Sequence, residues 1–407
     1  MIKIFKNSYV IQNIINLTFS SIVLKFIGFL YVTYFISKFG MDIYGSYILL
    51  ISYLGVIESF SSFGLFGLIK SKVIQNKKNI QLYNIMIIIT FIVMVISIFI
   101  LFTLKHINIY FLFLFVCFTI VTNYTNFLFF TSQQHKKWAK FQVIQGLFSY
   151  SSMFIYLYNN ENISVIVLMT IGYIVKLLFL SIFYLSNNKY LTNINFVIRK
   201  KYIFLYIRLI KNSGKWLLLN YLVNKVGLNF IPIILGESAG FAFVGIYDVI
   251  LKIISIFQMP LYTMEQLILT RIKKENIKKI RKEKLMYINL VSILLSLVSI
   301  GAVLLYIYIF SNTYFTEEYI ILTILFSLTI SNLGYRIFHR VYFLINEWTK
   351  EMMQLNTISS VFNTGMIILL SQMKYLNGYS VGIVTLITSF LGLFSYQYFY
   401  RRQNDKK

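Results

Sequence analysis

Long runs of apolar residues separated by short polar segments dominate this chain of 407 residues. Each run is close to the roughly 20 residues that a helix needs to cross a bilayer. Inside lipid only a helix or a closed barrel satisfies the backbone hydrogen bonds, and the alternating pattern of barrel strands is absent. The pattern therefore predicts twelve helical spans, near residues 15–37, 44–69, 83–104, 110–132, 141–158, 164–185, 214–235, 243–268, 287–310, 320–345, 353–371 and 380–400.

The longest polar segment, 186–213, divides the predicted spans into six and six. We therefore expect an all-α polytopic membrane protein with twelve transmembrane helices in two six-helix bundles. The expected lobes are 1–185 and 214–407, the second with a basic C-terminal tail. The segment 186–213 is expected to be a basic cytoplasmic linker between them.

The composition supports a membrane protein and excludes several other classes. Hydrophobic types make up 58% of the chain and charged types 13%, whereas soluble domains average about 45–50% and about 25%. A soluble enzyme, a disordered scaffold and a coiled coil are thereby excluded. The single cysteine and the three histidines have no metal-ligand spacing, and no catalytic motif is found. We predict no metal site and no catalytic residue.

The formal net charge of +25 would also suit a nucleic-acid-binding protein. The basic residues, however, are sorted by membrane side. If the N-terminus is cytoplasmic, the outer loops hold only Lys38, Lys105 and Lys374, and the inner segments hold most of the others. This positive-inside bias predicts two cytoplasmic termini and basic loops against anionic lipid, with no nucleic-acid partner.

A set of residues recurs, in order, in the two halves of the chain. In the first half the set is Lys25, Gly28, Gly40, Gly45 and Tyr47. In the second half it is Lys225, Gly227, Gly236, Gly245 and Tyr247. Six spans separate the copies, so both run in the same direction across the membrane. The recurrence predicts a parallel pseudo-two-fold repeat, which is common in transporters.

Two short stretches resemble a known family. The stretch LGESAGFAFVGIYDVILKI, residues 235–253, is similar to a signature in the second half of polysaccharide exporters, and KFGMDIYGSYILLISYL, residues 38–54, is similar to its first-half counterpart. With twelve spans, these stretches resemble the Wzx/RfbX O-antigen flippases of the multidrug/oligosaccharidyl-lipid/polysaccharide (MOP) superfamily. The resemblance implies a MOP-type fold.

Ionisable side chains inside the spans are the candidate functional residues, because a charge in lipid costs roughly 2.5–3.5 kcal/mol and normally faces a cavity or another charge. The candidates for substrate binding are the cations Lys25, Lys176, Lys225, Lys252 and Arg336. The candidates for binding a coupling ion are Glu58 and Asp248. The excess of cations suits an anionic substrate. The spacing of Asp248 and Lys252, i and i+4, fits either a structural ion pair or a functional site.

Small polar residues recur at helical spacing in the same spans. Two interpretations are open for them: hydrogen bonds between packed helices, or the polar lining of a transport cavity. The candidates for this lining are Ser21, Tyr221, Asn229, Asn356 and Asn363.

The resemblance implies a transporter and not an enzyme. It implies translocation of an undecaprenyl-diphosphate-linked oligosaccharide, an O-antigen or capsule repeat unit, from the inner to the outer leaflet of the bacterial inner membrane. We expect alternating access through a cationic cleft, coupled to H⁺ or Na⁺, without another cofactor. The polymerase and the chain-length regulator of lipopolysaccharide synthesis are candidate partners, together with the lipid bilayer.

Two alternatives are open. A MATE-like exporter of small molecules or drugs has the same fold, but it should carry more acid in its cleft because its substrates are usually cationic. A membrane glycan polymerase or ligase should have a large outer loop with catalytic Arg, His or acidic residues. The short outer loops of this chain disfavour the enzyme.

Overall fold

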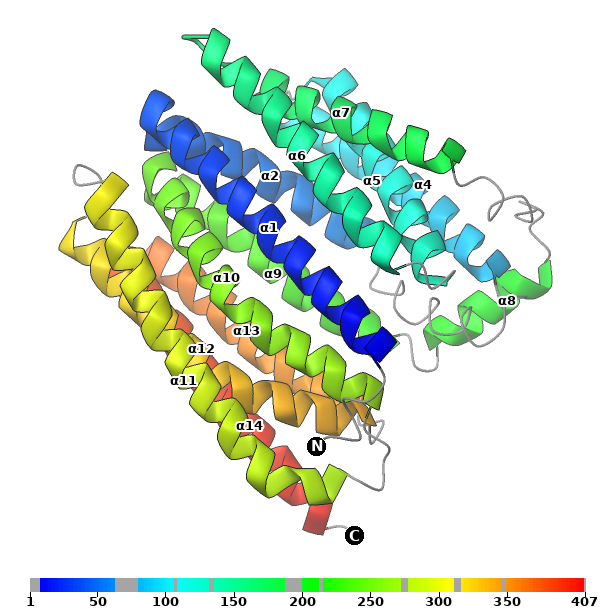
Figure 1. Cartoon of the computed structure of the whole chain (residues 1–407), viewed down its shortest axis with the longest axis vertical. Coiled ribbons are helices and arrows are strands. Elements are labelled where there is room, and N and C mark those ends of the chain that lie inside the picture. Colours follow the sequence, from blue (N-terminus) through cyan, green and yellow to red (C-terminus); the bar gives the residue numbers. More distant parts are fainter. Residues whose placement is uncertain are drawn as a thin grey trace. The chain divides into compact units, whose positions relative to one another are not determined.

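The computed structural model describes residues 8–62, 80–105, 108–131, 135–186, 200–211, 215–271, 277–310, 316–345 and 349–405. Within these ranges the chain is helical and contains no strand (Figure 1). The helices are α1 (Ser8–Phe39), α2 (Met41–Ser62), α4 (Ile80–Lys105), α5 (Ile109–Thr131), α6 (His135–Asn159), α7 (Val165–Ser186), α8 (Lys200–Leu209), α9 (Lys215–Ser238), α10 (Phe241–Arg271), α11 (Ile277–Phe310), α12 (Glu317–Ile345), α13 (Thr349–Gln372) and α14 (Gly378–Asp405).

Each of the twelve predicted spans coincides with one long helix, which confirms the predicted all-α fold class. The end of the second predicted span, 63–69, lies outside the described residues. Among the described residues, nine helices are long and apolar enough to cross a membrane, and Ile109–Thr125 is a shorter apolar helix. The protein is therefore a multi-pass membrane protein.

Helix α8 lies within the segment that the sequence predicts to be a linker. It is short and amphipathic: Lys200 and Lys201 are exposed, and Tyr206 is buried. The helix packs on α4, so this part of the linker has its own secondary structure. Most of the remaining linker, 187–199 and 212–213, lies outside the described residues.

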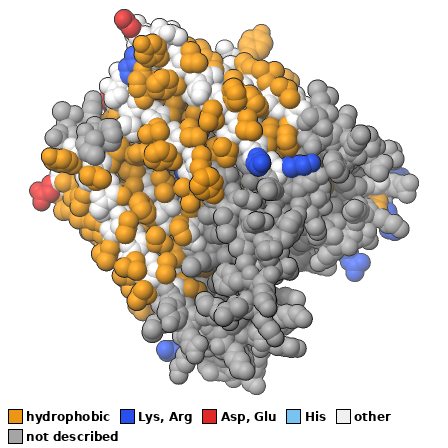
Figure 2. Space-filling model, viewed as in Figure 1, with side chains coloured by type: hydrophobic (Ala, Val, Ile, Leu, Met, Phe, Trp, Pro, Cys, Tyr) orange, Lys and Arg blue, Asp and Glu red, His pale blue; other side chains and the backbone are white. Residues whose placement is uncertain are grey.

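The packing of α11 shows how a lipid-facing helix differs from a helix in a soluble protein. Leu294 and Leu297 are more than half exposed, whereas Ser296 and Ser299 are buried. The Ser296 hydroxyl donates a hydrogen bond of 2.8 Å to the Ser327 carbonyl of α12. Small polar residues thus lie between helices and large apolar residues lie outside, as expected in lipid. Figure 2 likewise shows hydrophobic side chains over much of the described surface.

The contacts divide the chain into two compact units. The first, here called the C-terminal unit, comprises Met1–Thr18, Val32–Ser52 and Gly227–Lys407. The second, here called the N-terminal unit, comprises Phe19–Tyr31 and Tyr53–Val226. The ends of α1 and α2 that meet at their connecting turn therefore belong with the C-terminal helices. The expected lobes, 1–185 and 214–407, stay a prediction.

In the N-terminal unit, α7 is packed by both α5 and α6. The Gln145 amide nitrogen on α6 donates a hydrogen bond of 2.9 Å to the backbone carbonyl of Lys176 on α7. One turn along α6, the Ser149 hydroxyl donates to the Gly172 carbonyl at 3.3 Å. The two bonds hold α6 and α7 together along a polar seam.

In the C-terminal unit, α12 is the central helix and contacts α10, α11, α13 and α14. Its side chains Phe326 and Phe343 are fully buried. The rings of Phe343 and Tyr396 meet edge to face at 5.6 Å and join α12 to α14. This core holds the C-terminal end of α12 against α13 and α14.

Candidate functional site

Two glycines with a left-handed backbone occupy equivalent turns in the two halves of the chain. Gly40, with a φ of 85°, joins α1 to α2, and Gly240, with a φ of 91°, joins α9 to α10. A side chain would strain the backbone at either position. An offset of 200 therefore aligns Gly40 with Gly240, as it aligns Lys25 with Lys225 and Gly45 with Gly245, whereas Gly28 and Gly227 are 199 residues apart. The sequence comparison aligned Gly40 with Gly236, and that alignment is wrong because Gly236 lies inside α9.

The first turns of α2 and α10 cross in close contact within the C-terminal unit. A Cβ atom added at Gly45 would lie 1.7 Å from the carbonyl oxygen of Phe241. A Cβ atom added at Gly245 would lie 2.9 Å from the carbonyl oxygen of Met41. Each repeated glycine therefore contacts the first residue of the other helix, and the absence of a side chain permits the crossing.

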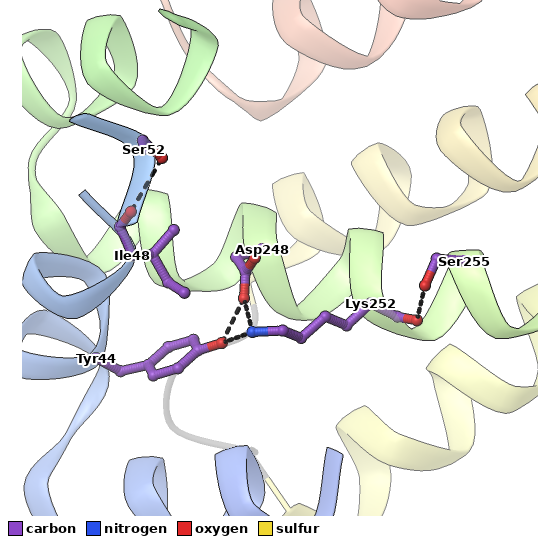
Figure 3. Close-up of polar contacts among 6 residues, drawn as sticks. All are labelled: Tyr44, Ile48, Ser52, Asp248, Lys252 and Ser255. Carbon is purple, nitrogen blue, oxygen red and sulfur yellow. Dashed lines mark hydrogen bonds and ion pairs between the residues drawn. The ribbon is translucent and has the colours of Figure 1, made fainter. Parts of the chain in front are cut away.

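A polar cluster of Tyr44, Asp248 and Lys252 lies beside this crossing (Figure 3). The Lys252 ammonium is 2.5 Å from an Asp248 carboxylate oxygen and donates to the Tyr44 hydroxyl. The Tyr44 hydroxyl in turn donates to the same Asp248 oxygen. The acid and the lysine are on α10, and the tyrosine is on α2. Asp248 and Lys252 thus form the ion pair that their spacing permits, and their roles in transport stay predictions.

The two repeats differ at this cluster. At an offset of 200, Asp248 and Lys252 correspond to Ile48 and Ser52 on α2. Ser52 is buried, and its hydroxyl donates to the Ile48 carbonyl of its own helix at 2.9 Å (Figure 3). The backbone crossing is therefore symmetric, whereas the charges belong to one copy alone.

We predict that Tyr44→Phe destabilises the protein by about 1.5 kcal/mol, because it removes a hydroxyl that bonds to both charged groups. Thermal unfolding of the purified protein in detergent measures this loss. Tyr110→Phe is the matched control, since the Tyr110 side chain is 83% exposed. Equal unfolding temperatures for the two variants would contradict a stabilising role for the cluster.

A second acid and lysine lie together in the N-terminal unit. Glu58 on α2 interacts electrostatically with Lys225 on α9 and with Tyr173 on α7. The side chains of Glu58 and Lys225 are both exposed. A charged side chain that is exposed within a span is costly against lipid and normally faces a water-filled space. Glu58 and Lys225 therefore suit a polar face of the N-terminal unit.

The other two lysine candidates of this unit have different surroundings. Lys25 is half-buried on α1, next to the turn where Gly28 approaches the Tyr150 hydroxyl. Lys176 on α7 places its ammonium 5.5 Å from the centre of the Phe118 ring, a cation–π contact. The ring offers Lys176 a stabilising partner within the helical bundle.

The remaining cation candidate, Arg336 on α12, lines a cavity in the C-terminal unit together with Asn356 on α13. The Asn356 side-chain oxygen accepts a hydrogen bond of 3.2 Å from the Tyr396 hydroxyl. The other predicted lining residue of α13, Asn363, accepts a hydrogen bond of 3.4 Å from the Thr388 hydroxyl. Asn363 thus bonds across packed helices, whereas Asn356 also faces a cavity.

The predicted site residues divide between the two units. The N-terminal unit holds Ser21, Lys25, Glu58, Lys176, Tyr221 and Lys225. The C-terminal unit holds Asn229, Asp248, Lys252, Arg336, Asn356 and Asn363. Ser21, Tyr221 and Asn229 are half-buried. One cleft lined by both sets stays a prediction.

The sequence analysis missed Arg340 and Tyr44. Arg340 lies in the tenth predicted span, 320–345, but was counted with the basic residues of the inner segment that follows, and the structure places it on α12, where it lines the same cavity as Arg336. The i and i+4 spacing of the two arginines is a signal that could have found it. Tyr44 could not be found in this way, since its partners lie on a helix of the other repeat.

No family model matches this chain, and no curated protein matches it. Several solved structures, however, have a fold similar to that of this chain. An outward-facing multidrug resistance MATE family transporter of the MOP superfamily is 12% identical, with a TM-score of 0.67 over 96% of this chain and 95% of that chain. An inward-facing conformation of such a transporter is 11% identical, with a TM-score of 0.63 over 94% of this chain and 96% of that chain.

A third similar structure is a MOP superfamily transporter from Pyrococcus furiosus, for which a binding pocket of reverse polarity suggests a different function. It is 13% identical, with a TM-score of 0.58 over 97% of this chain and 96% of that chain. These likenesses place the chain in a structural class, the multi-pass helical membrane proteins of transporter fold. More narrowly, the chain has the fold of the MATE transporters of the MOP superfamily.

Proposed function

We propose that this protein is a transporter of the MOP superfamily that moves a lipid-linked oligosaccharide across a bacterial inner membrane. The fold supports a membrane transporter, because its structural neighbours are transporters. The resemblance of residues 38–54 and 235–253 to polysaccharide exporters supports the flippase branch of the fold. The substrate is an undecaprenyl-diphosphate-linked O-antigen or capsule repeat unit, delivered to the outer leaflet by alternating access.

The observation that carries this proposal is the excess of cations in the spans. The two acids well inside the spans each have a lysine close by: Asp248 has Lys252, and Glu58 has Lys225. Further cations inside the spans include Lys25, Lys176, Arg336 and Arg340. The spans therefore carry more cations than acids, and this excess suits an anionic substrate such as a diphosphate.

The four further cations and the two acids have different proposed roles. The cations attract the diphosphate, while the sugars occupy polar space and the polyprenyl chain stays in lipid. Glu58 and Asp248 are the proposed carriers of a coupling H⁺ or Na⁺. Each acid could release its lysine when it binds the coupling ion, which would link the ion gradient to the charge of the substrate site. The polymerase and chain-length regulator are the proposed protein partners.

The second candidate function is export of small molecules or drugs. The observation that favours it is the structural likeness to multidrug resistance MATE transporters. The two functions differ in the charge of the substrate, so a binding experiment separates them.

We predict that undecaprenyl diphosphate, even without a glycan, raises the unfolding temperature of the detergent-solubilised protein. A ligand that binds the folded state stabilises it by mass action, about 2.7 kcal/mol at a hundredfold excess over Kd. The stabilisation should decrease with added salt where the site is wet. Ethidium, a cationic drug, should leave the unfolding temperature unchanged. Stabilisation by ethidium and none by the diphosphate lipid would assign the protein to drug export.

A further inference from the structure

Helix α8 (Lys200–Leu209) carries large apolar side chains on an exposed face. Phe204 is 72% exposed, and Ile203 and Ile207 are 40% and 43% exposed. Tyr206, which lies on the opposite side of the helix from Phe204, is buried. Since α8 packs on α4, one face of α8 is fixed to the N-terminal unit. The other face, which carries Phe204 and Ile207, is here called the open face of α8.

The length of the connecting chain places α8 close to a membrane surface. Five residues, 210–214, separate the end of α8 from the start of α9, which is one of the predicted spans. An extended chain covers at most about 3.6 Å for each residue, so the end of α8 lies within about 22 Å of the start of α9. Figure 1 shows α8 lying crosswise to α4 and the other long helices of its unit. A helix crosswise to the spans runs along the plane of the bilayer, as interfacial helices do.

The charges of this segment are all positive. Residues 200–211 include four basic residues and no acidic residue. The four basic side chains are exposed, and they are Lys200, Lys201, Arg208 and Lys211. Lys200 and Arg208 are one helical turn before and one turn after Phe204. Cations and large apolar side chains therefore lie next to one another on the open face of α8.

This combination matches an anionic lipid surface better than other occupants. The ring of Phe204 gains stabilisation at the boundary of the acyl chains, where it leaves water. Lysine and arginine stems extend along apolar surface while their charged groups reach outward to lipid phosphates. A cluster of four or more cations beside a span is typical of segments that bind anionic lipid. A neutral bilayer would satisfy the apolar side chains alone, and a protein partner would have to bring both acids and an apolar groove.

We propose that α8 binds anionic phospholipid, with Phe204 and Ile207 inserted at the boundary of the acyl chains and the four cations bound to lipid phosphates. The basic loops as a class are expected to lie against anionic lipid, whereas α8 is a defined site. Its one face is held by α4 and its open face by lipid. The proposal goes beyond the proposed function, because α8 carries none of the residues assigned there to the substrate or the coupling ion.

The test is fluorescence quenching of the full-length protein in vesicles, with Phe204→Trp as the reporter. The vesicles contain equal amounts of phosphatidylglycerol, which is anionic, and phosphatidylcholine, which is not. Bromine is carried by the acyl chains of one lipid or of the other, so the composition is constant. Bromine quenches a tryptophan only on contact. After subtraction of the wild-type emission, we expect quenching by both lipids and a preference for phosphatidylglycerol of at least about fivefold, the effect of one cation at an anionic surface.

Charge variants of this reporter show whether the cations cause the preference. Removal of three cations of the segment should abolish the preference and leave quenching by both lipids, in the variant Lys200→Gln, Arg208→Gln and Lys211→Gln. The matched control removes three exposed cations elsewhere and should keep the preference, in the variant Lys140→Gln, Arg401→Gln and Arg402→Gln. Added salt should reduce the preference, because the headgroups are in contact with water.

Ile207→Trp is a second reporter on the open face, for use if Phe204→Trp does not elute as a monodisperse protein. Equal quenching by the two brominated lipids would overturn the proposal, because it would mean apolar contact without recognition of charge. No quenching at either position would also overturn it and would assign the open face to water or to a protein partner. The measurement does not involve transport, so its outcome is independent of the proposed function.

Discussion

Gly45→Ala is expected to destabilise the protein by roughly 3 kcal/mol or more, the largest stability effect predicted for a single substitution in this chain. The added Cβ atom would lie 1.7 Å from the Phe241 carbonyl oxygen, which is backbone and cannot rotate away. Either α2 or α10 must shift, and the cluster of Tyr44, Asp248 and Lys252 would shift with it. Thermal unfolding of the purified variant in detergent measures the effect.

The structure also supplies graded controls. Gly245→Ala should cost less, because its Cβ atom would meet the Met41 carbonyl oxygen at 2.9 Å and the flexible Met41 side chain. Gly301→Ala and Gly365→Ala should be neutral or stabilising by up to about 1 kcal/mol, since an added Cβ atom would meet nothing within 4 Å and alanine favours a helix. If Gly45→Ala unfolds at the same temperature as Gly301→Ala, the close crossing of α2 and α10 is wrong.

Lys25→Ala and Lys225→Ala are each expected to abolish transport, which is the largest functional effect predicted. Removing one partner of a close charge pair costs roughly 2–5 kcal/mol, equivalent to at least about a thirtyfold loss of affinity for the diphosphate. The measurements are the surface polysaccharide of cells and the accumulation of lipid-linked repeat units on the inner leaflet. Both are compared at equal amounts of inserted protein.

Two controls separate substrate binding from other roles. Lys140→Ala removes an exposed lysine of α6 and should transport normally. The double variant Glu58→Gln with Lys225→Ala restores the charge balance of the acid and the lysine. If Lys225 serves only to neutralise Glu58, the double variant transports as the wild type does. If Lys225 binds the diphosphate, the double variant does not regain transport. Wild-type polysaccharide from either single variant would remove that lysine from the site.

The helical fold could be predicted from the sequence because hydropathy alone determines where a chain can cross lipid. Each of the twelve predicted spans overlaps one helix, although α1 and α11 begin several residues before the predicted spans, and residues 63–69 of the second predicted span lie outside the described part of the chain. The end of α12 agrees with the prediction, because the tenth predicted span and the helix both end at Ile345. Hydropathy does not indicate, however, that Arg340 on this helix lines a cavity.

Local spacing in the sequence indicated polar contacts within one helix. Contacts between residues far apart in the sequence could not be predicted in this way. The ion pair of Asp248 and Lys252, one of the two interpretations that their spacing left open, is present in the structure. The approach of Lys225 to Glu58 depends on how α9 packs near α2, which no local pattern encodes. The misalignment of Gly40 has a different cause, because the offset of 200 between Lys25 and Lys225 also pairs Gly40 with Gly240 in the sequence. The positive φ of Gly40 and Gly240 supports that pairing.

The crossing of α2 and α10 has the form of an isologous dimer contact. Gly45 meets Phe241 while Gly245 meets Met41, so position 45 of each repeat touches position 41 of the other at an offset of 200. A two-fold homodimer of identical six-helix subunits would make this reciprocal contact. In such a dimer every charged residue near the two-fold axis is present once in each subunit, and therefore twice. Fusion of both copies in one polypeptide removes that constraint, so one copy can carry Asp248 and Lys252 while the other keeps Ile48 and Ser52.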